Sequence, residues 1–206
     1  MTLGEALAAL PLIAILRGVT PDESIEIGRV LIRAGWRAIE VPLNSPAPFE
    51  SIRRLSREFG GAASIGAGTV LASEDVDRVA DAGGKLIVAP NGNEAVVKRA
   101  RALGLSSLPG FYTPTEAFRM IAAGADALKF FPADAAPPAM LKAMTAVLPA
   151  GVPLVPTGGI DAGNLRVWRE AGATGFGIGG ALYKPGIALD ELRLRAERLV
   201  QAARSP

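Results

Sequence analysis

The protein has 206 residues, half of them hydrophobic, with 22 basic and 20 acidic side chains and a formal net charge of +2. That length suits one domain with a sizeable core, and the balanced charge, without a basic patch rich in aromatics, argues against nucleic acid as a partner. The absence of cysteine and histidine excludes disulfides, cysteine nucleophiles, Ser-His-Asp triads and histidine-ligated metals, but not an all-carboxylate magnesium site. Covalent and proton-transfer chemistry therefore falls to Asp, Glu, Lys, Tyr, Ser or Thr.

The N-terminal stretch 1–16 is apolar, but it carries Glu5 where a leader would be basic, and Pro11 interrupts it. Arg17 ends it after too few residues to span a bilayer. This pattern predicts a short helix followed by a buried strand, and neither a signal peptide nor a membrane anchor. Since the chain also lacks cysteine, we expect it in the cytoplasm.

Eight short apolar segments recur along the chain, and the spacing between them leaves room for one crossover helix each time. The predicted strands are 12–16, 38–43, 64–70, 86–90, 106–110, 127–132, 153–159 and 175–180. Eight strand–helix units in so short a chain predict the α/β class, as a compact (β/α)8 TIM barrel in a single domain over residues 1–206. A doubly wound open sheet is the alternative, although the dinucleotide fingerprint is missing after the first strand.

The segments between these strands carry the start and stop signals of helices. Thr20 and Thr113 each precede a proline, the usual order of an N-cap and a first helical residue. Four helices are predicted to end at an Ala-Gly pair, whose glycine supplies the left-handed residue that stops a helix. These glycines are Gly35, Gly83, Gly124 and Gly172.

Two charged residues interrupt the predicted strands, and their parity directs them into the barrel. Their apolar neighbours alternate toward the surrounding helices, so Glu40, Lys129 and Phe131 take the inner face. The residues expected to face the helices are Ile39, Val41, Leu43, Leu128 and Phe130. Further polar residues near strand ends, where barrels place their chemistry, are Arg17, Thr69 and Thr157.

Lys129 and Glu40 are the candidate catalytic pair. Burial lowers the pKa of a lysine, and a neutral amine in an apolar pocket is what Schiff-base formation with a ketone requires. Burial raises the pKa of a carboxyl group toward the range of general acid and base catalysis. Two alternatives stay open at this point: Lys129 snorkels to the rim, or the two residues form a structural salt bridge.

Glycine-rich turns predict a phosphate site. Gly158 and Gly159 end the seventh predicted strand, and Gly179 and Gly180 end the eighth. Loops after these two strands commonly bind phosphate in such barrels, through backbone N–H groups. The alternative is that the glycines serve only as tight turns, and the lone G-x-G at 66–68 is weak evidence for a nucleotide.

Five motifs make the chain resemble the 2-keto-3-deoxy-6-phosphogluconate and 2-keto-3-deoxy-6-phosphogalactonate aldolase family over nearly its whole length. They are PLIAILRG at 11–18, EVPLNSP at 40–46, GAGTV at 66–70, KFFP at 129–132 and PTGG at 156–159. The resemblance implies a class I aldolase that uses neither metal nor organic cofactor. Lys129 would form an imine with the C2 ketone, and Glu40 would shuttle protons as a phosphorylated keto acid splits into pyruvate and glyceraldehyde 3-phosphate.

The same resemblance implies binding roles and an assembly. Arg17 and Thr69 would hold the substrate carboxylate. The pyruvyl pocket would be lined by Pro90, Phe131 and Thr157. The phosphate would be received by Gly158, Gly159, Gly179 and Gly180. Members of the family are homotrimers, so we expect a homotrimer here.

Details of the motifs favour the galactonate substrate. Arg17 and Asn44 resemble the galactonate type, whereas Thr157 resembles the gluconate type. Family members usually carry a serine in the phosphate loop of the eighth strand, where this chain has Gly-Gly-Ala at 179–181. We expect cleavage of 2-dehydro-3-deoxy-6-phosphogalactonate, with the gluconate epimer or both epimers as alternatives. A phosphosugar isomerase or epimerase on the same barrel, or a non-catalytic phosphate-binding protein, would reuse the same glycines.

Overall fold

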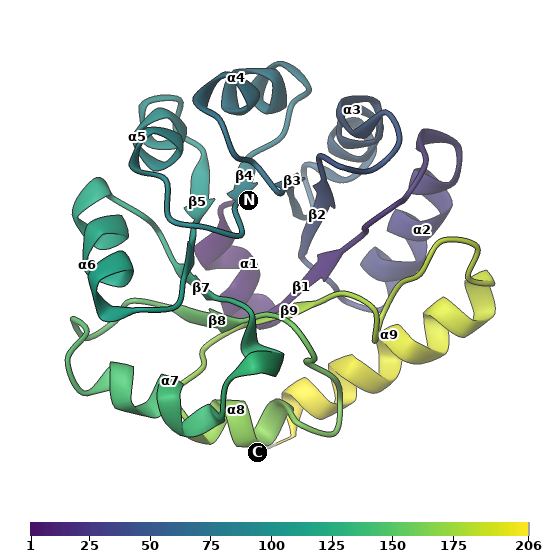
Figure 1. The fold of residues 1–206 in the computed structure, drawn as a ribbon. Helices are drawn as coiled ribbons and strands as arrows, with labels where there is room; N and C mark the ends of the chain where they lie inside the picture. Colours follow the sequence, from purple (N-terminus) through teal and green to yellow (C-terminus); the bar gives the residue numbers. More distant parts are fainter. Residues whose placement is uncertain (206) are drawn as a thin grey trace.

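A ring of parallel strands surrounded by helices makes up the fold in a computed structural model that describes residues 1–205 (Figure 1). The strands are β1 (Leu12–Ile15), β2 (Ala38–Pro42), β3 (Ser64–Gly68), β4 (Leu86–Val88), β5 (Ser106–Leu108), β6 (Gly110–Phe111), β7 (Leu128–Phe130), β8 (Leu154–Pro156) and β9 (Phe176–Ile178). The helices are α1 (Leu3–Ala9), α2 (Pro21–Arg33), α3 (Pro48–Phe59), α4 (Ser73–Asp81), α5 (Glu94–Ala102), α6 (Pro114–Ala123), α7 (Pro138–Thr145), α8 (Leu165–Glu170) and α9 (Leu189–Arg204). The predicted (β/α)8 barrel is therefore confirmed.

Hydrogen bonds close the ring in two sheets. One has the strand order β5-β4-β3-β2-β1-β9 and the other β6-β7-β8, and a bridge between Thr157 and Gly177 joins β8 to β9. The prediction of one strand over 106–110 was wrong, because Pro109 separates β5 from β6 and a proline has no N–H to donate. Its carbonyl still accepts from the N–H of Lys129 at 2.9 Å, so the pairing with β7 continues. Closure of the ring excludes the open doubly wound sheet.

The predicted parity of the strands is found in the packing. The residues predicted to face the helices, Ile39, Val41, Leu43, Leu128 and Phe130, all pack in the core with helix residues such as Leu31 of α2 and Leu55 of α3. A second, smaller cluster fills the inside of the barrel with strand residues such as Ile13 and Val155 and three residues of α1. The alternation along each strand thus separates an outer core from an inner one.

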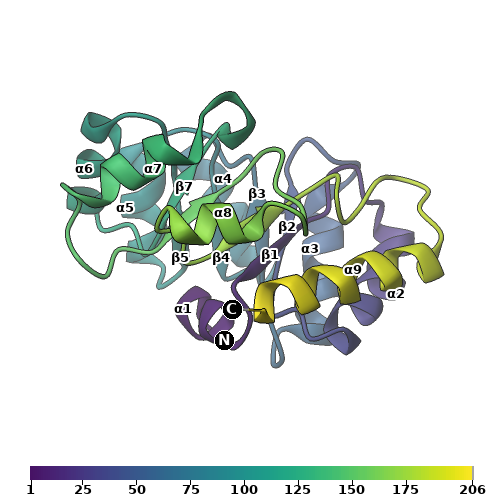
Figure 2. The same ribbon diagram turned by 90° about the horizontal axis from the view of Figure 1, so that it is seen from below.

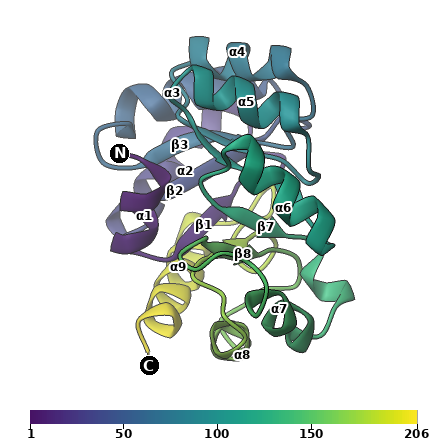
Figure 3. The same ribbon diagram turned by 90° about the vertical axis from the view of Figure 1, so that its left-hand side faces the viewer.

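Helix α1 closes one end of the barrel. Leu3, Ala6 and Leu7 are buried and belong to the inner cluster. Figure 1 shows α1 in the middle of the ring of helices, and Figure 3 shows it at one end of the barrel. Because the amino ends of the strands face α1, their carboxyl ends form the opposite, open mouth.

The predicted helix signals are also confirmed. Thr20 and Thr113 are the N-caps of α2 and α6, and each forms a capping box with a glutamate three residues later. The four glycines of the Ala-Gly pairs have positive φ angles of 100°, 82°, 96° and 102°, as expected of residues that stop helices. Helix α9 is the longest of the described helices and packs beside α2 on the outside of the barrel (Figure 2). Within residues 1–205, no helix is both long and apolar enough to cross a membrane.

Candidate active site

Glu40 and Lys129 lie inside the mouth of the barrel. Glu40 is 1% exposed and stands on β2, and Lys129 is 5% exposed and stands on β7. The charge of each affects the pKa of the other, so the two side chains share one environment. Lys129 therefore does not snorkel to the rim, which was the first alternative for this residue.

One oxygen of the Glu40 carboxylate lacks a hydrogen-bond donor. Its Oε2 is buried and has no hydrogen-bond partner, so the second alternative, a satisfied structural salt bridge, is not observed. Burial raises the pKa of Glu40 to about 7, against the opposing charges of Lys129 and Arg17. A carboxyl group with such a pKa can both take and return a proton near neutral pH.

Gly68 provides the space in which this carboxylate lies. A Cβ on Gly68 would lie only 2.0 Å from Oε2 of Glu40, and one on Gly66 would lie 1.9 Å from the carbonyl oxygen of Leu86. The G-x-G of residues 66–68 is thus required by close packing inside the barrel, where a side chain would collide with a neighbour. This explains a motif that the sequence left without a clear role.

The Lys129 amine is buried beside the ring of Phe131, and its pKa is lowered. Burial lowers the pKa of Lys129, the charge of Glu40 raises it, and the charge of Arg17 lowers it further. Its Nζ lies 5.0 Å from the centre of the Phe131 ring, so Phe131 covers it as the parity predicted. The net direction is downward, which favours the neutral amine that attacks carbonyl groups.

Arg17 lies at the rim, held by the loop after β2. Its Nη1 donates to Oδ1 of Asn44 at 2.6 Å, and the N–H of Gly18 donates to Oγ of Ser45 at 2.9 Å. These two contacts tie the loop after β1 to the loop after β2. They fix a guanidinium close enough to the catalytic candidates to affect the pKa of both.

Thr69 has an unusual backbone directly after β3. Its φ of 57° lies in the left-handed region, which a β-branched residue rarely occupies. Such strain is concentrated at functional sites, where it holds a group in a required orientation. Pro90 follows β4 and packs its carbonyl against Gly110, the residue in register with Lys129 on the neighbouring strand. Both residues therefore lie at the carboxyl ends of strands, as predicted.

Thr157 and the predicted phosphate glycines lie at the ends of β8 and β9. Thr157 is 5% exposed and packs against Gly177, where a Cβ would lie 2.2 Å from its Oγ1. Gly158 and Gly159 have φ angles of 106° and 64°, so this turn needs glycine for conformational reasons.

Gly179 and Gly180 differ from that pair. Their φ angles are not positive, and a Cβ on Gly179 would meet no atom within 4 Å. Neither packing nor backbone conformation therefore requires glycine at position 179. The alternative that this glycine serves only to make a tight turn does not explain it. Gly179 and Gly180 both line a pocket between the loops after β1 and β9.

Comparison with known proteins gives the family of this barrel. A family model described as "Aldolase: KDPG and KHG aldolase" matches residues 3–196. The chain belongs to the KDPG and KHG aldolase family. It is 45% identical to the 2-dehydro-3-deoxy-6-phosphogalactonate aldolase of Escherichia coli (strain K12) over 195 residues, and the aligned region covers 95% of each chain. It is 32% identical over 166 residues to the 2-dehydro-3-deoxy-phosphogluconate aldolase of Treponema pallidum (strain Nichols), 80% of this chain and 78% of the other.

The fold agrees with a solved member of this aldolase family. A structure described as native KDPGal superposes with a TM-score of 0.93 at 45% identity and covers 95% of each chain. The resemblance inferred from the five motifs is therefore confirmed at the level of family and fold.

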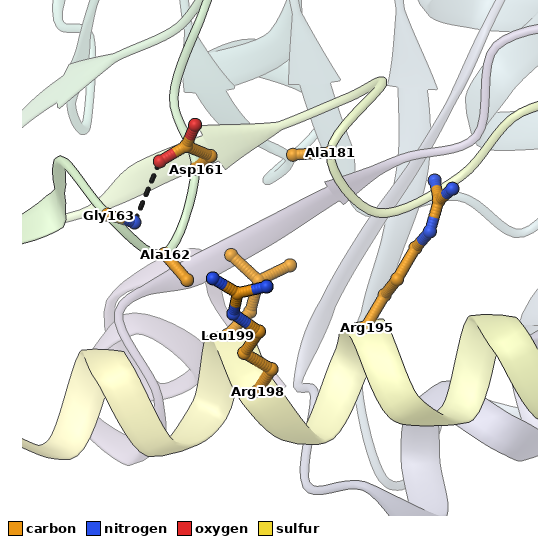
Figure 4. A pocket seen from close by; sticks show the side chains of 7 residues that line it. All are labelled: Asp161, Ala162, Gly163, Ala181, Arg195, Arg198 and Leu199. Atoms are coloured by element: carbon orange, nitrogen blue, oxygen red, sulfur yellow. Dashed lines mark hydrogen bonds between the residues drawn. The ribbon is translucent and has the colours of Figure 1, made fainter.

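One pocket lies on the outside of this aldolase barrel, beside α9 (Figure 4). It has a volume of about 320 Å³ and is lined by residues of the loop after β8 and by Arg195 and Arg198 of α9. Asp161 accepts from the N–H of Gly163 at 2.7 Å, and Arg195 donates to the carbonyl of Gly180 at 3.4 Å. None of the predicted site residues lines this pocket, so we place the active-site candidate in the barrel mouth.

Three residues at the barrel mouth were not assigned a role from the sequence. Gly68 makes room for Glu40, Asn44 holds Arg17, and Lys184 lies beside Gly180 in the loop after β9. The contact between Arg17 and Asn44 joins residues 27 positions apart, and no local pattern indicates it. Lys184 had one signal, a basic residue shortly after a Gly-Gly turn.

Proposed function

We propose that this protein is a class I aldolase that cleaves 2-dehydro-3-deoxy-6-phosphogalactonate into pyruvate and glyceraldehyde 3-phosphate. One observation carries the proposal: a buried lysine with a lowered pKa shares the barrel mouth with a buried glutamate whose pKa is about 7. This pair matches the needs of imine chemistry, a neutral amine to attack and a carboxyl group to move protons. The proposed reaction uses no metal and no organic cofactor.

In the proposed reaction, the Lys129 amine attacks the C2 ketone and forms a carbinolamine. Glu40 donates the proton that lets the C2 hydroxyl leave as water, and a protonated imine results. The carboxylate of Glu40 then removes the proton of the C4 hydroxyl, the C3–C4 bond breaks, and its electron pair moves into the iminium to give an enamine. Glyceraldehyde 3-phosphate leaves, C3 is protonated, and water releases pyruvate and restores Lys129.

The substrate would lie across the barrel mouth with an anionic group at each end. We propose that Arg17 and Thr69 bind its carboxylate. The pyruvyl part would contact Pro90, Phe131 and Thr157. The phosphate would accept hydrogen bonds from the backbone of Gly158, Gly159, Gly179 and Gly180. Their position after β8 and β9 supports this assignment, since barrels commonly bind phosphate there.

The choice of the galactonate epimer is supported by likeness and by one contact. The E. coli relative named for that substrate is more similar to this chain than the T. pallidum relative named for the gluconate. Arg17 and Asn44, the two residues that resemble the galactonate type, are hydrogen-bonded to each other at 2.6 Å. Thr157 favours the gluconate type, so cleavage of both C4 epimers is the second candidate. Rates measured on the two epimers would distinguish them.

Trapping of the imine tests the proposal. Incubation with pyruvate followed by borohydride should add one reduced pyruvyl group to the protein, and peptide mass spectrometry should locate it on Lys129. Lys129→Ala should abolish both the adduct and cleavage, whereas Lys142→Ala, which removes an exposed lysine of α7, should change neither. A folded wild-type protein that forms no adduct would refute the aldolase and favour an isomerase or a binding protein.

Assembly, location and domain extent are proposed from the resemblance and the composition. We propose a homotrimer, a cytoplasmic location and one barrel domain over residues 1–206. Light scattering of the purified protein would give a mass about three times that of the chain if the trimer is correct. A monomeric or dimeric mass would overturn that part of the proposal and leave the chemistry untouched.

A further inference from the structure

A pocket of about 360 Å³ lies in the barrel mouth between the loops after β1 and β9. Its lining includes the apolar Ile15 and the two glycines Gly179 and Gly180. Among the described residues that line it, the charged ones are Arg17 and Lys184, and both are basic. A pocket with apolar surface and two cations, without an acidic residue in its lining, favours an anionic ligand.

Lys184 stands on a segment that the fold holds in place. The N–H groups of Leu182 and Tyr183 both donate to the carbonyl of Gly179, at 2.8 and 3.0 Å. The hydroxyl of Tyr183 donates to Oε1 of Glu23 at 3.1 Å, which ties the segment to the start of α2. The segment is thus fixed at both its backbone and a side chain before any ligand binds.

The neighbouring loop also presses against this segment. A Cβ on Gly18 would lie 2.8 Å from Cγ of Pro185, so the loops after β1 and β9 touch next to the lysine. The acidic side chain that contacts this segment is Glu23, which accepts hydrogen bonds from the hydroxyl of Tyr183 and from the N–H of Thr20. Its carboxylate is therefore engaged at the base of the segment and not in the lining of the pocket.

The side chain of Lys184 runs alongside the predicted phosphate loop. Its Cε lies 3.9 Å from the position that a Cβ on Gly180 would occupy. The sequence Gly-Gly-Ala at 179–181 supplies no side-chain donor of its own. Backbone N–H groups carry only partial charges, whereas a phosphate dianion gains most from a full positive charge nearby. Lys184 is exposed and is the basic residue in the lining of this pocket that lies beside Gly180, whereas Arg195 of α9 donates to the carbonyl of Gly180 and is not part of that lining.

We propose that Lys184 is a specificity-determining residue whose ammonium group binds the distal phosphate of the substrate, so that the enzyme prefers phosphorylated over unphosphorylated keto acids. This inference rests on the proposed function. Lys184 acts at the end of the substrate away from the C2 ketone, so it contributes binding and takes no part in imine formation. Loss of its charge should therefore affect the phosphorylated substrate alone.

Lys184→Met tests the proposal, because methionine keeps an unbranched side chain and removes the charge. The expected result is a 10- to 100-fold fall in kcat/KM for the phosphorylated substrate, carried mainly by KM, which is about 1.4 to 2.8 kcal/mol. Activity on the unphosphorylated keto acid and trapping of pyruvate on Lys129 should stay unchanged. Lys184→Arg should restore most of the loss, and Lys142→Met on α7 is the matched control.

Two outcomes would overturn the proposal. Equal losses on the phosphorylated and unphosphorylated substrates would show a structural role, and an unchanged KM for the phosphorylated substrate would show no role. Binding of inorganic phosphate, followed by broadening of its ³¹P resonance, separates this inference from the proposed function. If the wild-type protein binds phosphate through Lys184 but traps no pyruvate, the aldolase reaction fails and the anion site stands.

Discussion

Gly68→Ala is a single-methyl change that tests whether the position of Glu40 matters. The new Cβ would lie 2.0 Å from Oε2 and 2.4 Å from Oε1 of Glu40, whereas ordinary contacts begin at 3.4 Å. Gly68 does not have a positive φ, so alanine fits the backbone, and the three atoms nearest to the new Cβ all belong to the carboxyl group of Glu40. Glu40 must therefore move by more than about 1 Å, or the strands must separate.

The size of the effect follows from that displacement. A shift of about 1 Å in a reacting group costs roughly 100-fold in rate, so we expect kcat to fall by about that factor. Overpacking of a tight interior costs about 1 to 3 kcal/mol, so the free energy of unfolding should fall as well. The assay is release of pyruvate from the phosphorylated substrate, with urea unfolding measured on the same samples.

Gly61→Ala is the matched control, because a Cβ there would meet no atom within 4 Å. It should leave both activity and stability unchanged. A folded Gly68→Ala protein with kcat within about threefold of wild type would refute the reasoning that Glu40 must hold its present position. If Gly68→Ala does not fold, Glu40→Gln tests instead whether the carboxyl group itself is needed, since it keeps the shape of the side chain. It should slow cleavage severely while some pyruvate is still trapped on Lys129.

Three further predictions concern the same mouth. Because the pKa of Glu40 is about 7 in the folded protein and 4.5 as a free side chain, its neutral form favours folding, and this stabilisation is lost as the pH rises through 7. The free energy of unfolding of Glu40→Gln, measured in urea relative to that of the wild type, should therefore be about 3 kcal/mol higher at pH 8 than at pH 4. The same difference between the two proteins at both pH values would contradict this. Asn44→Ala should raise KM about 10-fold with little change in kcat, because Arg17 loses the acceptor that holds it, and an unchanged KM would count against that role. Thr69→Gly should stabilise the fold by about 1 kcal/mol by relieving the positive φ but weaken substrate binding, and a destabilised variant would mean that no strain is stored there.

Much of the architecture could be predicted because its causes are local. The alternation along β2 and β7 puts Glu40 and Lys129 on the inner face, and this period of two holds whatever the rest of the chain does. Thr20 and Thr113 cap their helices through residues three positions away, and the Ala-Gly pairs end helices through the left-handed backbone that glycine allows. These features depend on neighbours in sequence, so a sequence alone determines them.

Tertiary structure decided what depends on distant neighbours. Pro109 splits a strand that otherwise looks continuous, and only the pairing with β7 shows that the barrel still closes there. Glycine is needed at position 68 because the carboxylate of Glu40 on the neighbouring strand occupies the space of a side chain, and Arg17 is oriented by its hydrogen bond to Asn44 in another loop. Lys184 reaches the barrel mouth because its segment is bonded to Gly179 and to Glu23 of α2. Each of these contacts joins strands or loops that are distant in sequence and become neighbours only when the parallel strands pair, so no window of sequence contains its cause.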